Sequence, residues 1–245
     1  MTDPKILVVY VPLTFAQIST KFFKSFLEMT GEDIRKDLRE KYGIEMILMI
    51  HDKFPIDLNR NDAFDRAVSK YDADYIMCCD ADQVFQKNTI PTLLNTLLES
   101  DVDAVTGVYF RKSPPHKTVV GKYSTWNKDI ELKRQSLYEQ GFITNDDHQT
   151  LFYKPLTHFD VVQPVDISGL GCFLFKADIL KRIEQPFCKY VNPYSTGGDF
   201  TFEGHSEDMW FFSQLKKAGV KILVNPKVVA GHIVEKVIIG NEAEL

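Results

Sequence analysis

The stretch Tyr75-Ile76-Met77-Cys78-Cys79-Asp80-Ala81-Asp82-Gln83-Val84-Phe85 is a short apolar run that ends in two carboxylates one residue apart. A run of this length with aromatic and β-branched residues predicts a buried strand of a parallel sheet. Asp80 and Asp82 would then lie just beyond the C-terminal end of that strand. Ligands of open α/β sheets bind at this edge, so the position favours a functional site over a surface turn.

The Asp-x-Asp motif is weak evidence on its own, because it occurs three times in the chain. The copies at residues 72–74 and 101–103 lie in polar connections, where a solvated turn explains them. Only Asp80-Ala81-Asp82 follows a strand-like run. Its context therefore selects this copy as the candidate site.

Length and composition indicate a globular protein in which a single α/β domain over residues 1–245 is as well supported as two small ones. The chain is 44% hydrophobic and 26% charged, as in ordinary globular proteins, and its length allows one substantial core. The formal net charge of −5 gives no reason to expect tight, nonspecific binding to nucleic acid. An acidic protein that binds a polyanionic ligand needs the help of a cation.

The four cysteines have no metal-ligand spacing, and two of them lie in the predicted buried strand. Reduced, structural thiols are the expected state, which suits an intracellular compartment. No apolar run approaches the length that spans a membrane, and the first residues lack the basic region of a signal peptide. We therefore expect a cytoplasmic protein without a membrane span.

The N-terminal part of the sequence alternates strands with helices. This alternation is typical of a doubly wound, nucleotide-binding sheet. The expected elements are a strand at 6–11 closed by Pro12, an amphipathic helix at 17–29, a strand at 43–50 that leads to His51 and Asp52, and a helix capped by Asn61 or Asp62.

The pattern weakens after the central strand and returns near the C-terminus. Residues 112–165 are polar and aromatic and predict an insertion or small subdomain. The other expected elements are a helix at 90–98, strands at 104–110, 166–175 and 220–224, a helix through 179–183, and a helix that begins at Ser206 and stops at Gly219.

Five short motifs occur in a fixed order between about residues 5 and 235. They are Arg60-Asn61, Asp80-Ala81-Asp82, Gly169-Leu170-Gly171-Cys172, Ser206-Glu207-Asp208 and Gly231-His232-Ile233. Together they resemble the motifs of a GT-A glycosyltransferase, most closely the family-two-like nucleotide-sugar transferases. The resemblance implies an α/β, Rossmann-like GT-A fold with a mostly parallel central sheet, flanking helices and a small inserted region.

The resemblance also implies a division of the domain. Residues 1–111 would hold the nucleotide-sugar, residues 112–165 would form the insertion, and residues 166–245 would hold the acceptor and the catalytic groups. One feature departs from the family. The first strand leads into Val11-Pro12-Leu13-Thr14 instead of an acidic-ended loop, which affects the expected contacts with the base.

A divalent metal site is the first function that the resemblance implies. Carboxylate oxygens hold hard cations such as Mn²⁺ or Mg²⁺, and such an ion stabilises a departing diphosphate. Asp80 and Asp82 are the expected carboxylate ligands, and His232 is the expected third ligand because a neutral imidazole suits manganese. The alternative is a capping turn at the strand end, together with a core or surface histidine that binds no metal.

Glu207 and Asp208 follow Ser206 at the start of a predicted helix. The helix dipole favours acidic residues in a first turn, so a structural explanation exists. By resemblance, Asp208 is the general base that removes the proton from an acceptor hydroxyl, and Glu207 holds the acceptor.

The nucleotide-sugar would contact residues from both halves of the chain. Asp52 could accept a hydrogen bond from the base, Arg60 could meet base or phosphate, and the glycine turn could bring bare backbone to the donor sugar, although a β-bulge would use the same glycines. The expected contact residues are Val11, Pro12, Asp52, Arg60, Asp80, Ala81, Gly169 and Gly171.

The resemblance thus implies a metal-dependent, hexosyltransferase-type enzyme that moves a sugar from a UDP- or GDP-sugar to an acceptor hydroxyl, with inversion. A retaining GT-A enzyme and a non-catalytic binding module stay open. A sugar-1-phosphate nucleotidyltransferase would need a basic, glycine-rich loop after the first strand, and residues 11–19 lack one. The acceptor could be a glycan, a lipid carrier, a protein side chain or a modified nucleobase.

Overall fold

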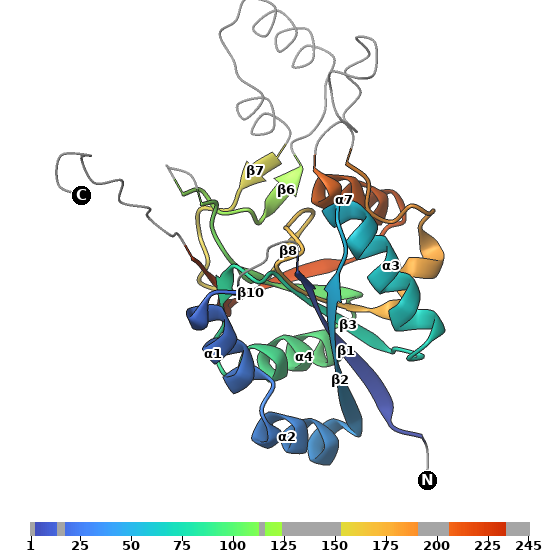
Figure 1. Ribbon diagram of the computed structural model, residues 1–245. Helices are drawn as coiled ribbons and strands as arrows, with labels where there is room; N and C mark the ends of the chain where they lie inside the picture. The colour runs from blue at the N-terminus through green and yellow to red at the C-terminus, as the bar shows by residue number, and fades with distance from the viewer. Residues whose placement is uncertain (1–2, 14–17, 113–115, 124–152, 191–205, 234–245) are drawn as a thin grey trace, which may run out of the picture.

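A seven-stranded sheet forms the centre of the protein in the computed structural model (Figure 1). The structure describes residues 3–13, 18–112, 116–123, 153–190 and 206–233. Within these residues the strand order is β2-β1-β3-β9-β5-β10-β8. The strands are β1 (Lys5–Leu13), β2 (Ile44–Asp52), β3 (Tyr75–Cys79), β5 (Ala104–Val108), β8 (Gln163–Val165), β9 (Cys172–Lys176) and β10 (Ile222–Val229).

The sheet is mostly parallel. β1 pairs in parallel with β2 and β3, and β5 pairs in parallel with β10. β9 runs antiparallel between β3 and β5, and β8 runs antiparallel at the edge. The predicted α/β, Rossmann-like GT-A fold is therefore confirmed.

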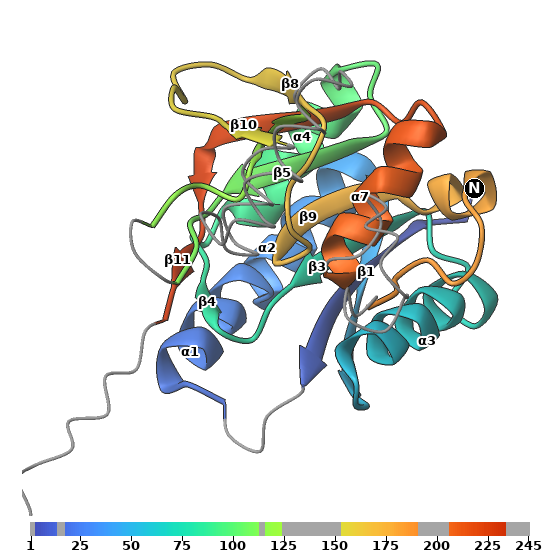
Figure 2. The same cartoon turned by 90° about the horizontal axis from the view of Figure 1, so that it is seen from above.

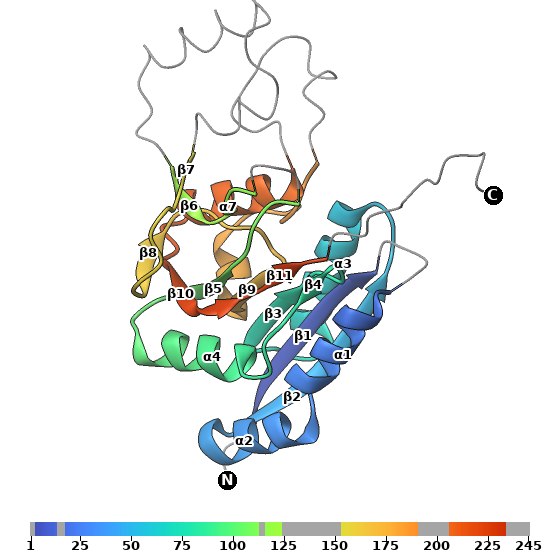
Figure 3. The ribbon, with the colours of Figure 1, turned by 90° about the vertical axis from the view of Figure 1, so that its left-hand side faces the viewer.

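Helices cover both faces of the sheet and form two apolar layers. α1 (Thr20–Met29), α2 (Glu32–Tyr42) and α4 (Thr89–Glu99) cover the face that Figure 3 presents. α3 (Ile56–Ser69), the 3-10 helix η1 (Ala177–Arg182) and α7 (Glu207–Lys217) cover the other face. In Figure 2 α1 and α3 lie on either side of β1. β3 is buried along its whole length because both layers enclose it.

Two small antiparallel sheets lie outside the central one. β4 (Gln83–Val84) pairs with β11 (Gly231–His232), and β6 (Gly121–Tyr123) pairs with β7 (Tyr153–Pro155). β6, β7 and β8 all come from the predicted insertion, of which residues 113–115 and 124–152 lie outside the described residues. Of these strands only β8 joins the central sheet, by pairing with β10, and Gly121 of β6 forms an isolated bridge with Ile167.

The predicted start of α3 is wrong. Neither Asn61 nor Asp62 caps the helix, which begins at Ile56 behind Pro55. The Asn61 amide instead binds backbone groups of Asp57 and Cys188, at 2.7 and 2.6 Å. Pro55 is the extended N-cap residue, and it has no backbone N–H that would need a partner there.

The first strand is also longer than predicted, because Pro12 does not end it. β1 continues to Leu13. Its pairing with β3 stops at Tyr10, whereas its pairing with β2 runs on to Leu13. Beyond Tyr10 the strand has one neighbour only, so the missing N–H of Pro12 is tolerated there.

Other elements also differ from the sequence-based expectation. The strand expected at 166–175 is shorter, because β9 begins only at Cys172. α2 was not predicted, and the predicted helix through 179–183 is the 3-10 helix η1. The predicted strand at 220–224 is β10, which continues through Pro226 to Val229 with a shift of register. That extension leads the chain directly to β11, which carries His232.

Candidate functional site

The candidate site lies at the C-terminal end of β3, where the chain turns into β4. Asp80 follows the last residue of β3, and its backbone N–H donates to Gly171 O at 3.1 Å. The turn closes with a hydrogen bond of 3.2 Å from Gln83 N to Asp80 O. Asp80 and Asp82 are therefore held at the sheet edge that the sequence predicted.

The pairing of β4 with β11 brings the C-terminal part of the chain to this turn. His232 lies opposite Gln83, and Ile233 N donates to Asp82 O at 2.8 Å. The His232 Nε2 atom is 3.9 Å from Asp82 Oδ1. Two residues that are far apart in sequence, and that were predicted to share one ion, thus lie side by side.

Arg60 joins the end of β3 to the start of α7. Its Nη2 atom is 3.3 Å from Asp80 Oδ1, 3.4 Å from Glu207 Oε1 and 3.4 Å from Asp208 Oδ1. The Arg60 side chain is only 4% exposed. One buried cation therefore lies among three carboxylates that come from the two predicted halves of the site.

Ser206 and its two acidic neighbours form the predicted helix start. Ser206 caps α7 by accepting a hydrogen bond from Met209 N at 3.3 Å, and Glu207 and Asp208 occupy the first turn. Asp208 Oδ2 accepts a hydrogen bond from Leu170 N at 3.3 Å. This bond ties the first turn of α7 to the glycine turn that precedes β9.

Burial dominates the acid–base properties of the two aspartates. It raises the pKa of Asp208 to about 6, although the Arg60 guanidinium and the Leu170 N–H both favour the anion. Burial raises the pKa of Asp80 to about 6 as well, again against the effect of Arg60. Carboxyl groups in such surroundings ionise close to neutral pH, which is typical of functional sites.

The glycine turn packs against side chains that leave no space for a methyl group. A Cβ atom on Gly169 would lie 1.8 Å from Tyr109 Oη and 3.0 Å from Asp208 Oδ2. A Cβ atom on Gly171 would lie 2.3 Å from Gln83 Nε2 and 2.7 Å from Asp80 Oδ2. Neither glycine has the positive φ that would require it, so close packing is the reason for glycine here.

Tyr109 and Gln83 belong to the site but were not predicted. Tyr109 is buried, accepts a hydrogen bond from Gly171 N at 3.4 Å and stacks edge-on against His232. Its burial raises the pKa of the phenol, which stays protonated at neutral pH. Gln83 is fully buried, and its amide atoms have no hydrogen-bond partner among the described residues. The available signal was a polar residue directly after a strand end or after the Asp-x-Asp motif.

Four of the predicted contact residues lie outside this cluster of carboxylates. Val11 and Pro12 are buried near the end of β1, where they pair with β2 beyond the last residue that pairs with β3. Asp52 ends β2 and is exposed, with β1 between it and β3. Ala81 is partly buried and packs on the core layer that contains α1. Their contact with a nucleotide stays a prediction.

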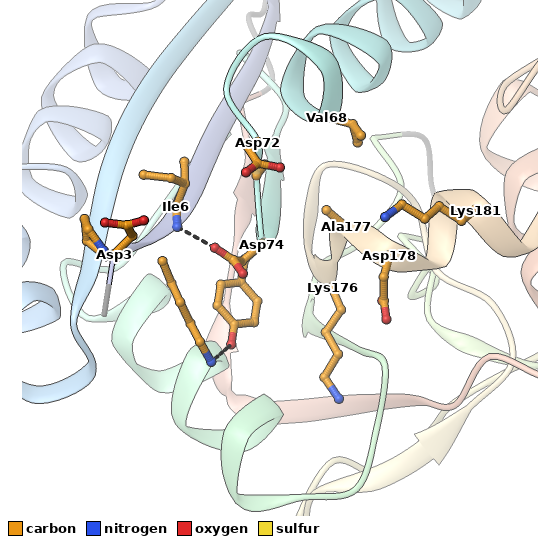
Figure 4. Close-up of a pocket in the computed structure, with 13 residues that line it drawn as sticks. Asp3, Ile6, Val68, Asp72, Asp74, Lys176, Ala177, Asp178 and Lys181 are labelled. Carbon is orange, nitrogen blue, oxygen red and sulfur yellow. Dashed lines mark hydrogen bonds between the residues drawn. The ribbon is translucent and has the colours of Figure 1, made fainter. Parts of the chain in front are cut away.

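A pocket of about 710 Å³ lies at the opposite edge of the sheet (Figure 4). Asp74 in its wall already accepts a hydrogen bond from Ile6 N at 2.8 Å, and Lys5 donates to Tyr75 Oη at 3.4 Å. Lys181 and Asp178 are solvent-exposed. The pocket contains none of the predicted site residues, and its charged lining is that of a solvated surface.

Comparison with known families identifies the chain. The sequence model described as "Glycosyl transferase family 2" matches residues 34–158, which is just over half of the chain. The chain belongs to glycosyl transferase family 2. This confirms the resemblance that the five motifs indicated. Family 2 membership supports glycosyltransferase activity with a nucleotide-sugar donor.

The family 2 match covers only part of the candidate site. It includes Arg60, Asp80 and Asp82, but it ends before Asp208 and His232. The geometry described above is what places those two residues beside the matched ones. No helix within the described ranges has the length and apolar character needed to cross a membrane.

Similarity to a solved structure adds information on the fold. The structure titled "Crystal Structure of A197 from STIV" is similar, with a TM-score of 0.56 and 16% sequence identity, over 94% of this chain and 86% of that chain. At this identity the likeness concerns the fold alone. No curated protein matches the chain.

Proposed function

We propose that this family 2 protein is a metal-dependent, inverting hexosyltransferase that uses a UDP- or GDP-sugar. The observation that carries the proposal is the 3.9 Å approach of Asp82 to His232, at the strand end to which Arg60 also joins the partly buried carboxylate of Asp208. We assign the nucleotide-sugar to residues 1–111 and the acceptor to residues 166–245, with 112–165 as the insertion. The four cysteines are buried free thiols, which supports a cytoplasmic location.

The residues around Asp82 fit a divalent cation. Asp82 Oδ1 is buried and has no hydrogen-bond partner among the described residues, and the Lys112 ammonium contacts the other oxygen, Oδ2. A carboxylate that already attracts one cation and lies beside an imidazole suits Mn²⁺ or Mg²⁺. The described residues contain no group of three or more metal-ligating side chains. Donor phosphate oxygens would complete the coordination, as is usual for magnesium.

Asp82 and His232 would hold the ion, with Asp80 beside them. The ion would supply Lewis-acid stabilisation of the departing nucleoside diphosphate. Asp82 Oδ1 would be the oxygen that holds it, since Oδ1 lies toward His232 and Lys112 contacts only Oδ2.

Asp208 is the proposed base. Its Oδ1 atom lies at the Arg60 ion pair without a hydrogen bond, so it can accept the proton of an acceptor hydroxyl. As that proton moves to Asp208, the acceptor oxygen bonds to the anomeric carbon, and the bond from that carbon to the diphosphate oxygen breaks. A single displacement of this kind inverts the anomeric centre. Glu207, next to Asp208, is proposed to hold the acceptor.

The raised pKa of Asp208 predicts how activity and stability depend on pH. The base acts as an anion, so kcat/KM should rise with pH to a plateau, with a midpoint near the pKa of about 6. We expect a loss of about tenfold between the plateau and pH 5, because kcat/KM reports the groups of the free enzyme. Asp80 ionises in the same pH range beside the same arginine. The fall of kcat/KM at low pH therefore reports the Asp80–Asp208 pair and not Asp208 alone.

Stability should change in the opposite direction across the same pH range. The folded protein keeps these protons up to a pKa of about 6, whereas the unfolded chain loses them near the ordinary value of 3.8. The free energy of unfolding contributed by the two groups therefore falls as pH rises from about 4 to 6. Chemical denaturation across this range measures it. A kcat/KM plateau that persisted down to pH 5 would contradict the proposed environment of Asp208.

A thermal-shift screen of nucleotides and nucleotide-sugars, with and without Mn²⁺, tests the proposed function. We expect UDP or GDP and one of their sugars to raise Tm only when the metal is present. A ligand at 100 times its Kd stabilises a folded protein by about 2.7 kcal/mol. A protein that no nucleotide stabilises in a metal-dependent way would not have the proposed function.

Two aspartates provide a matched pair of variants for this screen. Asp82→Asn should remove the metal-dependent shift, because it takes away the carboxylate that faces His232. Asp101→Asn should retain it. Asp101 belongs to another Asp-x-Asp copy, and its side chain is 98% exposed, with a surface pair to Lys221.

A further inference from the structure

We propose that Arg60 is a positioning residue that holds the base Asp208 and its neighbour Glu207 against Asp80, and so joins the acceptor side of the site to the donor side. The inference rests on the proposed function, because it takes Asp208 as the base. It gives Arg60 a role that differs from the contact with base or phosphate expected from the sequence.

The contacts of the guanidinium carry this inference. A single nitrogen atom, Nη2, lies within 3.4 Å of all three carboxylates. Asp80 follows β3, whereas Glu207 and Asp208 begin α7, and Arg60 itself comes from α3. Three segments that are distant in sequence thus meet at one charge.

Arg60 is held rigidly by the two residues that flank it. The Asn59 amide donates to His51 O at 2.9 Å and to Lys53 O at 2.8 Å, and its oxygen accepts from Tyr10 Oη at 2.7 Å. On the other side, Asn61 exchanges hydrogen bonds with the backbone of Cys188. A residue fixed in this way can fix its partners in turn.

Burial makes the charge of Arg60 necessary for this arrangement. The side chains of Glu207, Asp208 and Asp80 are 12%, 23% and 25% exposed. Like charges that are partly removed from water repel one another strongly, and an opposite charge among them offsets this repulsion. Without Arg60 the first turn of α7 would lose its charge contact with the end of β3, and Asp208 would no longer be held toward the donor.

Arg60 is poorly placed to be a ligand of the nucleotide. Its side chain is 4% exposed, and its Nε and Nη1 atoms are buried without hydrogen-bond partners among the described residues. The nitrogen that reaches the site edge is already shared by carboxylates. A role in positioning and a role in donor binding therefore predict different kinetic effects.

Arg60→Lys separates these two roles. The variant keeps the charge, so the carboxylates stay compensated and the protein should fold, but a lysine side chain is shorter and lacks the planar guanidinium. With the donor found in the screen, we expect kcat to fall about 100-fold, the effect of a misplacement of about 1 Å. The Kd of the matching nucleotide with Mn²⁺, measured by calorimetry, should stay within about threefold. A raised Kd with an unchanged kcat would mean that Arg60 binds the nucleotide, and the positioning role would be wrong.

A stability experiment tests the same inference without any donor. Arg60→Met should be less stable than the wild type, because it leaves the three carboxylates without their cation. Adding Asp208→Asn should then raise the stability, with an increase of about tenfold in the folding equilibrium constant, because it removes one of the repelling charges. In the wild-type background Asp208→Asn should give a clearly smaller gain, since there it also removes a partner of Arg60. If Arg60→Met does not fold, the same cycle is measured with Arg60→Lys, where a smaller gain of the same sign is expected.

Arg182 provides the matched control for this double-mutant cycle of Arg60 and Asp208. It also pairs with an aspartate, since its Nη1 atom is 2.9 Å from Asp103 Oδ1, and it is remote from Asp208 in the described contacts. In an Arg182→Met background, Asp208→Asn should have the same effect as in the wild type. A gain of the same size in the Arg60→Met and Arg182→Met backgrounds would overturn the inference. The cycle needs no transfer activity, so it can support the Arg60 contacts even if the screen contradicts the proposed function.

Discussion

Replacing Asp208 by Asn is expected to remove most of the transfer activity and to leave the donor bound. General base catalysis by a positioned side chain contributes about 10²–10⁴-fold to a rate. An amide cannot accept the proton, so kcat should fall by a factor in that range. The Kd of the nucleotide with Mn²⁺ should change little, because Asp208 is proposed to act on the acceptor and not on the nucleotide.

The structure explains why asparagine is the informative replacement at this position. Its side-chain oxygen can still accept the hydrogen bond from Leu170 N, which Asp208 Oδ2 now accepts at 3.3 Å. Arg60 keeps two carboxylates, those of Asp80 and Glu207. The folded structure should therefore persist, and the loss of activity can be assigned to chemistry.

Glu207→Gln provides the comparison within the same helix turn. If Glu207 holds the acceptor and Asp208 is the base, Glu207→Gln should act mainly through the KM of the acceptor, and Asp208→Asn through kcat. Release of nucleotide from the donor, followed with saturating acceptor, measures both. An Asp208→Asn protein that keeps a large part of the wild-type kcat would show that the base lies elsewhere. A variant of Glu207 that lost kcat instead would exchange the two roles.

The central strand and its carboxylates could be predicted because their signals are local. An apolar run with no polar position, as in residues 75–79, is required where helices cover both faces of a sheet, and β3 is buried throughout. The carboxylates follow that strand directly, so their place at the sheet edge needs no knowledge of distant contacts. The position of Asp80 and Asp82 could therefore be predicted from one short stretch of sequence.

The pairing of Asp82 with His232 is a different case, because it depends on β4 and β11. Each of these strands has two residues, which is too short for a periodic pattern. Their pairing joins segments about 150 residues apart, and only the order of the family motifs pointed to it. The likeness to known transferases supplied what local physics could not.

Arg60 was expected at the site, but the sequence could not show which residues it contacts. Helix periodicity assigns buried positions to apolar residues, whereas α3 buries Asn59 and Arg60 next to Ala63 and Phe64. Asn59 and Arg60 interrupt the apolar pattern near the start of α3. For this reason the helix was expected to begin at Asn61 or Asp62 and not at Ile56. A buried arginine is explained only by its partners, and these come from β3 and α7. Residues that break a local rule are often functional for this reason.

Gly169→Ala is expected to lower both stability and activity, because the site has no space for the added methyl group. Its Cβ atom would lie 1.8 Å from Tyr109 Oη. The ring of Tyr109 is buried and packs edge-on against His232, so it cannot swing away without moving a proposed metal ligand. Overpacking of this kind costs about 1–3 kcal/mol. The turn would instead move outward and carry the Leu170 N–H away from Asp208, with a loss of about 100-fold in kcat.

Tyr109→Phe provides the test of this mechanism, because it removes the oxygen atom that the new methyl group meets. In the double variant the nearest remaining atoms are Cζ of residue 109 and Asp208 Oδ2, both at 3.0 Å, so part of the lost stability should return. Gly231→Ala is the control for stability, since its Cβ atom meets nothing within 4 Å, and its free energy of unfolding should change by less than about 0.5 kcal/mol. Denaturant titration of the wild type, Gly169→Ala, the double variant and Gly231→Ala measures the free energy of unfolding. If Tyr109→Phe restored nothing, the cause of the damage would be the backbone of the turn and not the contact with the phenol.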